Sequence, residues 1–188
     1  MVRNPLSPTP VSNLRLSRFQ IAAYGLIPNT SLQNRPLMIY HSVFPPSSNP
    51  NADSISSHLT RIPHGVRPAW RYTMYSQDHF HSTSHEVLAI ASGSAKCSFG
   101  HMDNPKKVEV ELNTGDVVIV PAGVCHRMVE ETRRPFMMVG SYPEGCEWDM
   151  CYGTQGEEGK VDRIRGLVWL KADPIYGDGG PAVGVWKE

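Results

Sequence analysis

The middle of the chain is a succession of short apolar segments separated by turn residues, and this pattern constrains the fold more than any other feature. The breaks between the segments are rich in Gly, Pro and Asn, and no helical segment intervenes. Many short strands at this spacing favour an antiparallel sandwich or barrel. The predicted strands are residues 78–81, 86–91, 95–99, 108–112, 117–120, 125–129 and 136–142.

The flanking segments add more strands and one short helix. Ile55, Leu59 and Ile62 recur at the spacing of one helical face, behind Asn51 and Asp53, either of which could cap the helix. Residues 145–160 are rich in turn residues. Further strands are predicted for residues 19–27, 36–44, 70–75 and 163–170. We therefore expect an all-β protein with one short helix in its N-terminal part.

Length and charge limit the organisation and the partners. At 188 residues the chain is long enough for one domain with a sizeable core. Residues 1–17 are rich in Pro, Ser and Asn and are predicted to form a flexible N-terminal arm, followed by a single domain over residues 18–188. The formal net charge is zero and no apolar run reaches the length of a membrane span. We expect no nucleic acid and no membrane as a partner, but a small-molecule substrate.

Cysteine usage and the start of the chain bear on the compartment. The four cysteines show no C-x-x-C spacing, which indicates reduced thiols in a cytoplasmic protein. No acidic residue precedes Asp53, whereas Arg3, Arg15, Arg18 and Arg35 do. That asymmetry is typical of mitochondrial import signals, but the early prolines oppose an amphipathic helix, so import is the minority alternative.

Three histidines and one glutamate indicate a mononuclear metal site. His79 and His81 are two residues apart, so in a strand both project to the same face. Glu86 opens the next predicted strand, and His126 can join them from a distant one. Imidazole nitrogens with one carboxylate suit one divalent transition metal: Fe(II) is favoured, and Mn(II), Ni(II) and Zn(II) are possible. Surface or core histidines without a metal are the alternative.

The neighbours of these residues are ambiguous. His85 should point away from the metal if Glu86 points inward, although a slip in register would reverse the pair. Cys125 should face away from the site as a small hydrophobe. Arg71 could hold a substrate carboxylate if it faced inward, and Asp149 reads as surface charge.

The spacing of these residues resembles the cupin family. The first cupin motif is matched by His79, His81, Glu86 and Gly93, and the second by Gly115, Pro121, Gly123 and His126. Thr73 stands where the first motif begins with Gly, and Glu130 where the second ends with Asn; neither is a ligand position. The resemblance implies a jelly-roll β-barrel with the metal inside.

More narrowly, the chain is similar to the YjlB-like branch of cupins from about residue 27 onward. The sequence segments that carry this similarity include residues 79–88, 115–124, 142–145 and 173–177. The biochemistry of this branch is poorly defined, so the similarity makes the predicted fold more specific but not the predicted reaction. Cupins of this size commonly form homodimers, and we expect one here.

Three functions compete. The first is an Fe(II) dioxygenase-like enzyme acting on a small organic molecule, with Glu86 as a catalytic residue as well as a ligand. The second is a redox-neutral metal-dependent isomerase, epimerase or decarboxylase, in which Glu86 or a pocket tyrosine moves a proton. The third is a non-catalytic cupin that binds a small ligand.

Overall fold

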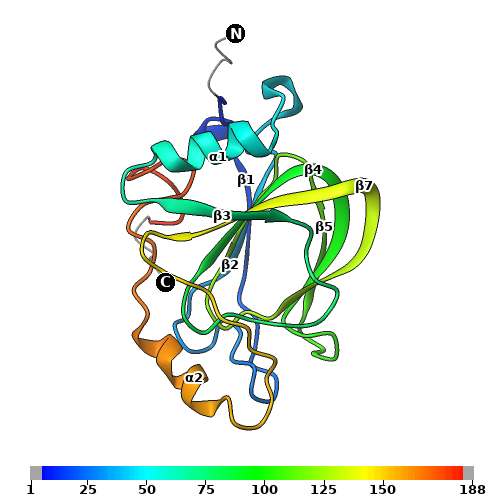
Figure 1. Cartoon of the computed structure of the whole chain (residues 1–188), viewed down its shortest axis with the longest axis vertical. Coiled ribbons are helices and arrows are strands. Elements are labelled where there is room, and N and C mark those ends of the chain that lie inside the picture. Colours follow the sequence, from blue (N-terminus) through cyan, green and yellow to red (C-terminus); the bar gives the residue numbers. More distant parts are fainter. Residues whose placement is uncertain (1–5, 184–188) are drawn as a thin grey trace.

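The computed structural model describes residues 6–183, and seven strands in this part form one antiparallel sheet (Figure 1). Their order is β1-β2-β6-β4-β7-β3, with β5 paired to β4. The strands are β1 (Arg15–Phe19), β2 (Leu37–His41), β3 (Val66–Tyr72), β4 (Glu86–Phe99), β5 (Val108–Asn113), β6 (Val117–Val120) and β7 (His126–Pro143). The expectation of an all-β protein is confirmed.

The two longest strands, β4 and β7, bend the sheet into a barrel. The first part of β4 pairs with β6, from Glu86 to Ala89, whereas its second part pairs with β5, from Ser94 to Phe99. β7 accompanies β4 along both parts, with register shifts between Ile90 and Cys97. Because such shifts bend and twist the strands, one ribbon serves both halves of the barrel (Figure 1).

The sequence predicts each of these long strands as two short ones, and that prediction is wrong. The expected break in β4 lies at Gly93, which has a φ of 71° and whose added Cβ would stand 2.3 Å from the Arg133 carbonyl oxygen. Glycine therefore lets the two strands approach closely at the shift in register. A glycine that permits a bulge looks, in the sequence, like one that ends a strand.

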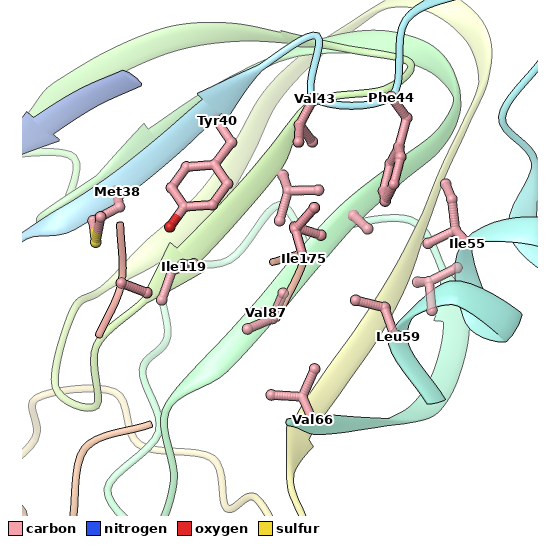
Figure 2. Close-up of a cluster of buried hydrophobic side chains, with 14 of the residues drawn as sticks. Met38, Tyr40, Val43, Phe44, Ile55, Leu59, Val66, Val87, Ile119 and Ile175 are labelled. Carbon is pink, nitrogen blue, oxygen red and sulfur yellow. The ribbon is translucent and has the colours of Figure 1, made fainter. Parts of the chain in front are cut away.

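The sheet is apolar on both faces because each face is covered. In β6, Val117 and Ile119 belong to one buried cluster, and Val118 and Val120 to the other. The first cluster fills the space between the outer face of the sheet and α1 (Ala52–Arg61), with Ile55 and Leu59 from that helix (Figure 2). The second cluster occupies the barrel interior, which is also the side that Glu86 faces, since side chains two apart share a face.

Helix α1 forms where the sequence predicts it. The side chain of Asn51 accepts hydrogen bonds from the backbone N–H groups of Asp53 and Ser54, and Ser54 Oγ accepts from the Asn51 N–H. This capping box selects Asn51 over Asp53 as the cap. Among residues 6–183, no helix is long and apolar enough to cross a membrane.

Four short helical elements of the described residues were not expected. They are η1 (Val11–Asn13), η2 (Pro46–Ser48), and the consecutive α2 (Glu158–Arg163) and η3 (Ile164–Gly166). The last pair replaces the first half of the strand predicted for residues 163–170, and α2 lies at the end of the molecule opposite α1 (Figure 1). Ile164 explains the apolar pattern: it is buried against Phe80 and does not belong to a sheet.

The N-terminal predictions also need correction. The structure places a strand at β1, not at residues 19–27, where it has only an isolated bridge between Tyr24 and Ile27. Residues 15–17 of the expected arm lie in the sheet, and Leu6 is buried. Residues 1–5 of the arm fall outside the described part, and the single domain over residues 18–188 stays a prediction.

Candidate metal centre

His79 and His81 lie in a short extended segment just before β4. The structure pairs it by isolated bridges and not as the strand predicted for residues 78–81: His79 bonds to His126, and Phe80 to Cys151. The alternation of an extended chain nevertheless holds. Phe80 is buried in an apolar cluster with Cys151, while the two histidines point into the barrel.

The second half of the site is the turn that leads into β7. The N–H of Gly123 donates to the His81 carbonyl at 2.9 Å, and the backbones of His79 and His126 exchange two hydrogen bonds of 2.9 and 3.3 Å. These bonds hold the first residue of β7 against the His-x-His segment. The three histidines therefore meet although 45 residues separate the second from the third.

The three imidazole rings bring their potential ligand atoms close together. A potential ligand atom of each ring lies within 4.8 Å of those of the other two. On the other side of each ring, Nδ1 contacts a backbone carbonyl oxygen. His79 contacts that of Gln77 at 2.9 Å, His81 that of Asp149 at 2.5 Å, and His126 that of Val124 at 3.0 Å. A carbonyl oxygen only accepts, so each Nδ1 donates and the neutral ring keeps its Nε2 lone pair free.

Glu86 lies beside these nitrogens. Its Oε2 is 3.3 Å from His126 Nε2 and 3.5 Å from His81 Nε2. This oxygen is buried and has no hydrogen-bond partner among the described residues. Since buried carboxylate oxygens are normally paired, an unpaired one beside the Nε2 atoms of two of the three histidines fits a bound cation.

Burial and neighbouring groups set the protonation of the cluster. Burial, helped by the nearby His126 ring, lowers the pKa of His79 to about 3. For His81, burial opposes the charged form, but the Glu86 carboxylate outweighs it and raises the pKa. Burial alone would raise the pKa of Glu86, yet His81 and His126 bring it well below its usual range. Glu86 is thus ionised at neutral pH, as a metal ligand must be.

Tyr142 is a site residue that the sequence analysis does not single out. Its hydroxyl donates to Glu86 Oε1 at 2.5 Å and accepts a 2.9 Å hydrogen bond from Trp70 Nε1. Trp70 lies directly on the β7 backbone, because a Cβ added at Gly140 would stand 2.0 Å from its ring. The hydrogen bonds from Trp70 to Tyr142 and from Tyr142 to Glu86 thus fix the position of the Glu86 carboxylate. No local pattern signals it, since 56 residues separate Tyr142 from Glu86.

Asp149 is not the surface charge that the sequence suggests. Its carboxylate accepts hydrogen bonds from the Ser82 N–H and Oγ, each at 2.7 Å, while its carbonyl holds His81 Nδ1. Although burial acts the other way, the hydrogen bonds from Ser82 lower the pKa of Asp149. Asp149 therefore ties the segment after β7 to the His-x-His segment.

The ambiguous neighbours of the site are now placed. His85 points away from the cluster: its Nδ1 accepts from the Ala122 N–H at 3.0 Å and its ring contacts Trp169. Cys125 is fully buried among apolar side chains, and burial raises the pKa of its thiol. Arg71 pairs with Asp53 on α1 at 2.6 Å.

A cavity of about 340 Å³ opens onto the cluster. Its volume is within the range of small-molecule sites. All four predicted ligands contribute to its wall, and most of the remaining lining is aromatic or thioether: Trp70, Tyr72, Met74, Tyr75, Met138, Tyr142, Trp148 and Met150.

Comparison with known proteins agrees with this geometry. The family model for the cupin domain matches residues 73–142, which contain all four predicted ligands and Tyr142. An uncharacterized protein of Bacillus subtilis, YjlB, is 32% identical over 124 residues, which are 65% of this chain and 73% of YjlB. The chain belongs to the cupin superfamily, in the YjlB-like branch.

The similar solved structures are more distant. A variant of Bacillus subtilis oxalate decarboxylase is 16% identical with a TM-score of 0.35, covering 71% of this cupin and 28% of the decarboxylase. Procruciferin, a globulin of Brassica napus, is 12% identical with a TM-score of 0.32, covering 69% of this cupin and 25% of the globulin. This cupin thus spans little more than a quarter of either chain.

The chemistry of the donor set is that of a metal-binding cupin. Three imidazole nitrogens suit a transition metal, and an ionised carboxylate beside them suits the same ions.

Proposed function

We propose that this cupin is a mononuclear metal-dependent enzyme of the Fe(II) dioxygenase type, acting on a small organic molecule. His79, His81, Glu86 and His126 would hold the ion. The observation that carries the proposal is the orientation of the cluster: each Nδ1 is used by the backbone, so three Nε2 lone pairs and Glu86 Oε2 remain for one cation.

Iron(II) held by these residues would activate O₂ for reaction with the substrate, which supplies the electrons, and would serve as a template for the substrate. The chain's own residues perform the other tasks. The cavity walls exclude water and orient the substrate toward the cluster. Tyr142 keeps Glu86 in place through its hydrogen bond to Oε1.

One observation favours the redox-neutral alternative, an isomerase, epimerase or decarboxylase. The 2.5 Å hydrogen bond from the Tyr142 hydroxyl to Glu86 Oε1 holds a phenol and a carboxylate together at the wall of the cavity, where either group could move a proton to or from a substrate. Burial, followed by the charge of Glu86, raises the pKa of the Tyr142 phenol, so this group rests with its proton in place.

The dependence of turnover on O₂ distinguishes the dioxygenase from the redox-neutral enzyme. Protein loaded with Fe(II) would be tested against a panel of phenols, catechols, thiols and small diketones in an oxygen electrode and, in parallel, under strict anaerobiosis. We expect O₂ uptake that His126→Ala abolishes. Anaerobic turnover would instead support the redox-neutral reaction, and ligand binding without turnover in either condition would favour the non-catalytic cupin.

The homodimer and the cytoplasmic location stay predictions from the sequence. Light scattering on the purified chain would test the dimer, which we expect at twice the chain mass of 20.9 kDa. A monomer at micromolar concentration would contradict it.

A further inference from the structure

Exposed aromatic side chains gather at the mouth of the cavity. Tyr72, Tyr75 and Trp148 are exposed by 59%, 57% and 44%, and all three line the opening. They come from three places in the chain: the end of β3, the loop that follows it, and the segment after β7. Exposed aromatics grouped around a pocket are typical of a binding surface.

Trp148 and Tyr75 at the mouth are held in place by contacts with residues of the candidate metal site. Trp148 stacks on Tyr142 with ring centroids 4.8 Å apart and an angle of 7° between the ring planes. Tyr75 meets His79 edge to face, with the centroids 5.6 Å apart. The aromatic faces at the mouth are thus held by one predicted ligand, His79, and by Tyr142, which supports another, so a molecule between them would reach the histidine cluster.

Deeper in the cavity the lining is apolar and adaptable. Met74 and Met138 are buried at 3% and 1% exposure, and Leu88 lies beside them in the same cluster. Met150 lines the cavity as well. Methionine sulfur makes favourable contacts with aromatic rings and adjusts to irregular shapes. This part of the wall suits a flat ring better than a compact, strongly hydrated anion.

The charge of the cavity also disfavours a small anion. Among the residues that line it, Arg71 is the one Lys or Arg side chain. Its guanidinium is committed to α1, 2.6 Å from Asp53 Oδ1 and 3.1 Å from Ser56 Oγ. A dicarboxylate would then meet no free Lys or Arg side chain among the residues that line the cavity.

We propose that the substrate of this cupin is a planar, uncharged aromatic molecule. Its ring packs against Trp148, Tyr75 and the methionines, and its polar end faces the histidine cluster. The ring-binding part depends only on the cavity wall, whereas the orientation toward a metal rests on the proposed function.

Indole binding tests whether the cavity wall holds an aromatic ring, independently of any metal, because indole is planar, neutral and a poor chelator. Isothermal titration would measure indole and oxalate binding to the Fe(II)-loaded protein and to protein dialysed against a chelator. Indole is expected to bind both forms, and more tightly than oxalate in both. Trp148→Ala should weaken indole binding about tenfold, the order of one aromatic contact.

Tyr152→Ala is the matched control, since Tyr152 is a 39% exposed aromatic of the same segment that does not line the cavity. It should leave indole binding unchanged. Tyr75→Ala provides a second test, and thermal melting checks that each variant folds. Oxalate binding without indole binding, or equal indole affinity in wild type, Trp148→Ala and Tyr75→Ala, would overturn the inference. Indole binding by a chain that cannot hold metal would uphold it and refute the proposed function instead.

Discussion

Two buried carboxylates of this cupin have opposite surroundings. Asp173 has no exposed surface, and its two oxygens accept four hydrogen bonds, from the Tyr40 hydroxyl and the N–H groups of Ile175, Tyr176 and Ala182. Glu86 is equally buried, but it accepts one bond, from Tyr142, and its other oxygen faces His81 and His126.

The difference separates a structural carboxylate from a functional one. Fixed donors satisfy Asp173 as soon as the chain folds, so it ties the C-terminal segment to β2 through Tyr40. Burial and the neighbouring Asp173 raise the pKa of the Tyr40 phenol, which keeps that donor protonated. Glu86 instead keeps one oxygen without a hydrogen-bond partner among the described residues, and a bound cation would satisfy it.

The largest effect on stability is expected at Asp173. Asp173→Asn replaces one oxygen by an NH₂ group that must face donors, so we expect the free energy of unfolding to fall by about 3 kcal/mol. Urea denaturation measures it, with Asp178→Asn, an exposed aspartate of the same loop, as the control. A variant as stable as the control would show that these four bonds do not distinguish Asp173.

Glu86→Gln should show the reverse pattern. The metal-free protein is expected to keep its stability to within about 1 kcal/mol, because the substitution removes a buried charge that lacks a full set of partners. Affinity for the transition metal should fall by at least about a hundredfold, more than the loss of an outer hydrogen bond would cost. Competition with a chelating dye measures it, with Glu130→Gln on the exposed surface of β7 as the control. Unchanged metal affinity would remove Glu86 from the site.

A smaller effect is predicted for Tyr142→Phe. The variant leaves Glu86 Oε1 without its donor and Trp70 Nε1 without its acceptor. Metal affinity should weaken about tenfold, and stability should fall by about 1 to 2 kcal/mol. The same dye assay and denaturation test both, against Tyr152→Phe. Loss of stability with metal affinity intact would make the Tyr142 bond purely structural, like those of Asp173.

The smallest effect concerns the thiols, which extend the comparison to groups away from the metal. Burial raises the pKa of Cys97 to about 12, and burial with the Asp149 hydrogen bond raises that of Cys151 to about 11. Alkylation needs the thiolate, so at pH 8 the native protein should react once, at the exposed Cys146. Mass spectrometry with Cys146→Ser as the control checks this. Fast labelling of Cys97 would mean that the interior opens more readily than the packing indicates.

The parts of the site that depend on local geometry could be predicted from the sequence. The two-residue spacing of His79 and His81 sends both side chains inward in any extended segment, even without the expected strand. The same alternation at the start of β4 turns Glu86 toward the barrel interior, and His85, just before this strand, toward Trp169. These placements follow from the alternation of side chains along an extended backbone alone.

The supporting residues could not be predicted, because they act across long separations. Tyr142 reaches Glu86 through the pairing of β4 with β7, and Trp70 reaches Tyr142 through the pairing of β3 with β7. Asp149 reaches His81 from an irregular segment. Strand continuity was hidden for a related reason. Gly93 marks a close approach to Arg133 that only the folded sheet reveals.

The metal content of the chain tests the central claim most directly. Protein purified without a histidine tag would be loaded with Fe(II), freed of excess metal and measured by elemental analysis, alongside His81→Ala and His126→Ala. We predict close to one transition-metal ion per wild-type chain and little in either variant. A wild type that cannot be loaded with Fe(II), Mn(II), Ni(II) or Zn(II), or variants that hold as much metal as the wild type, would contradict the account.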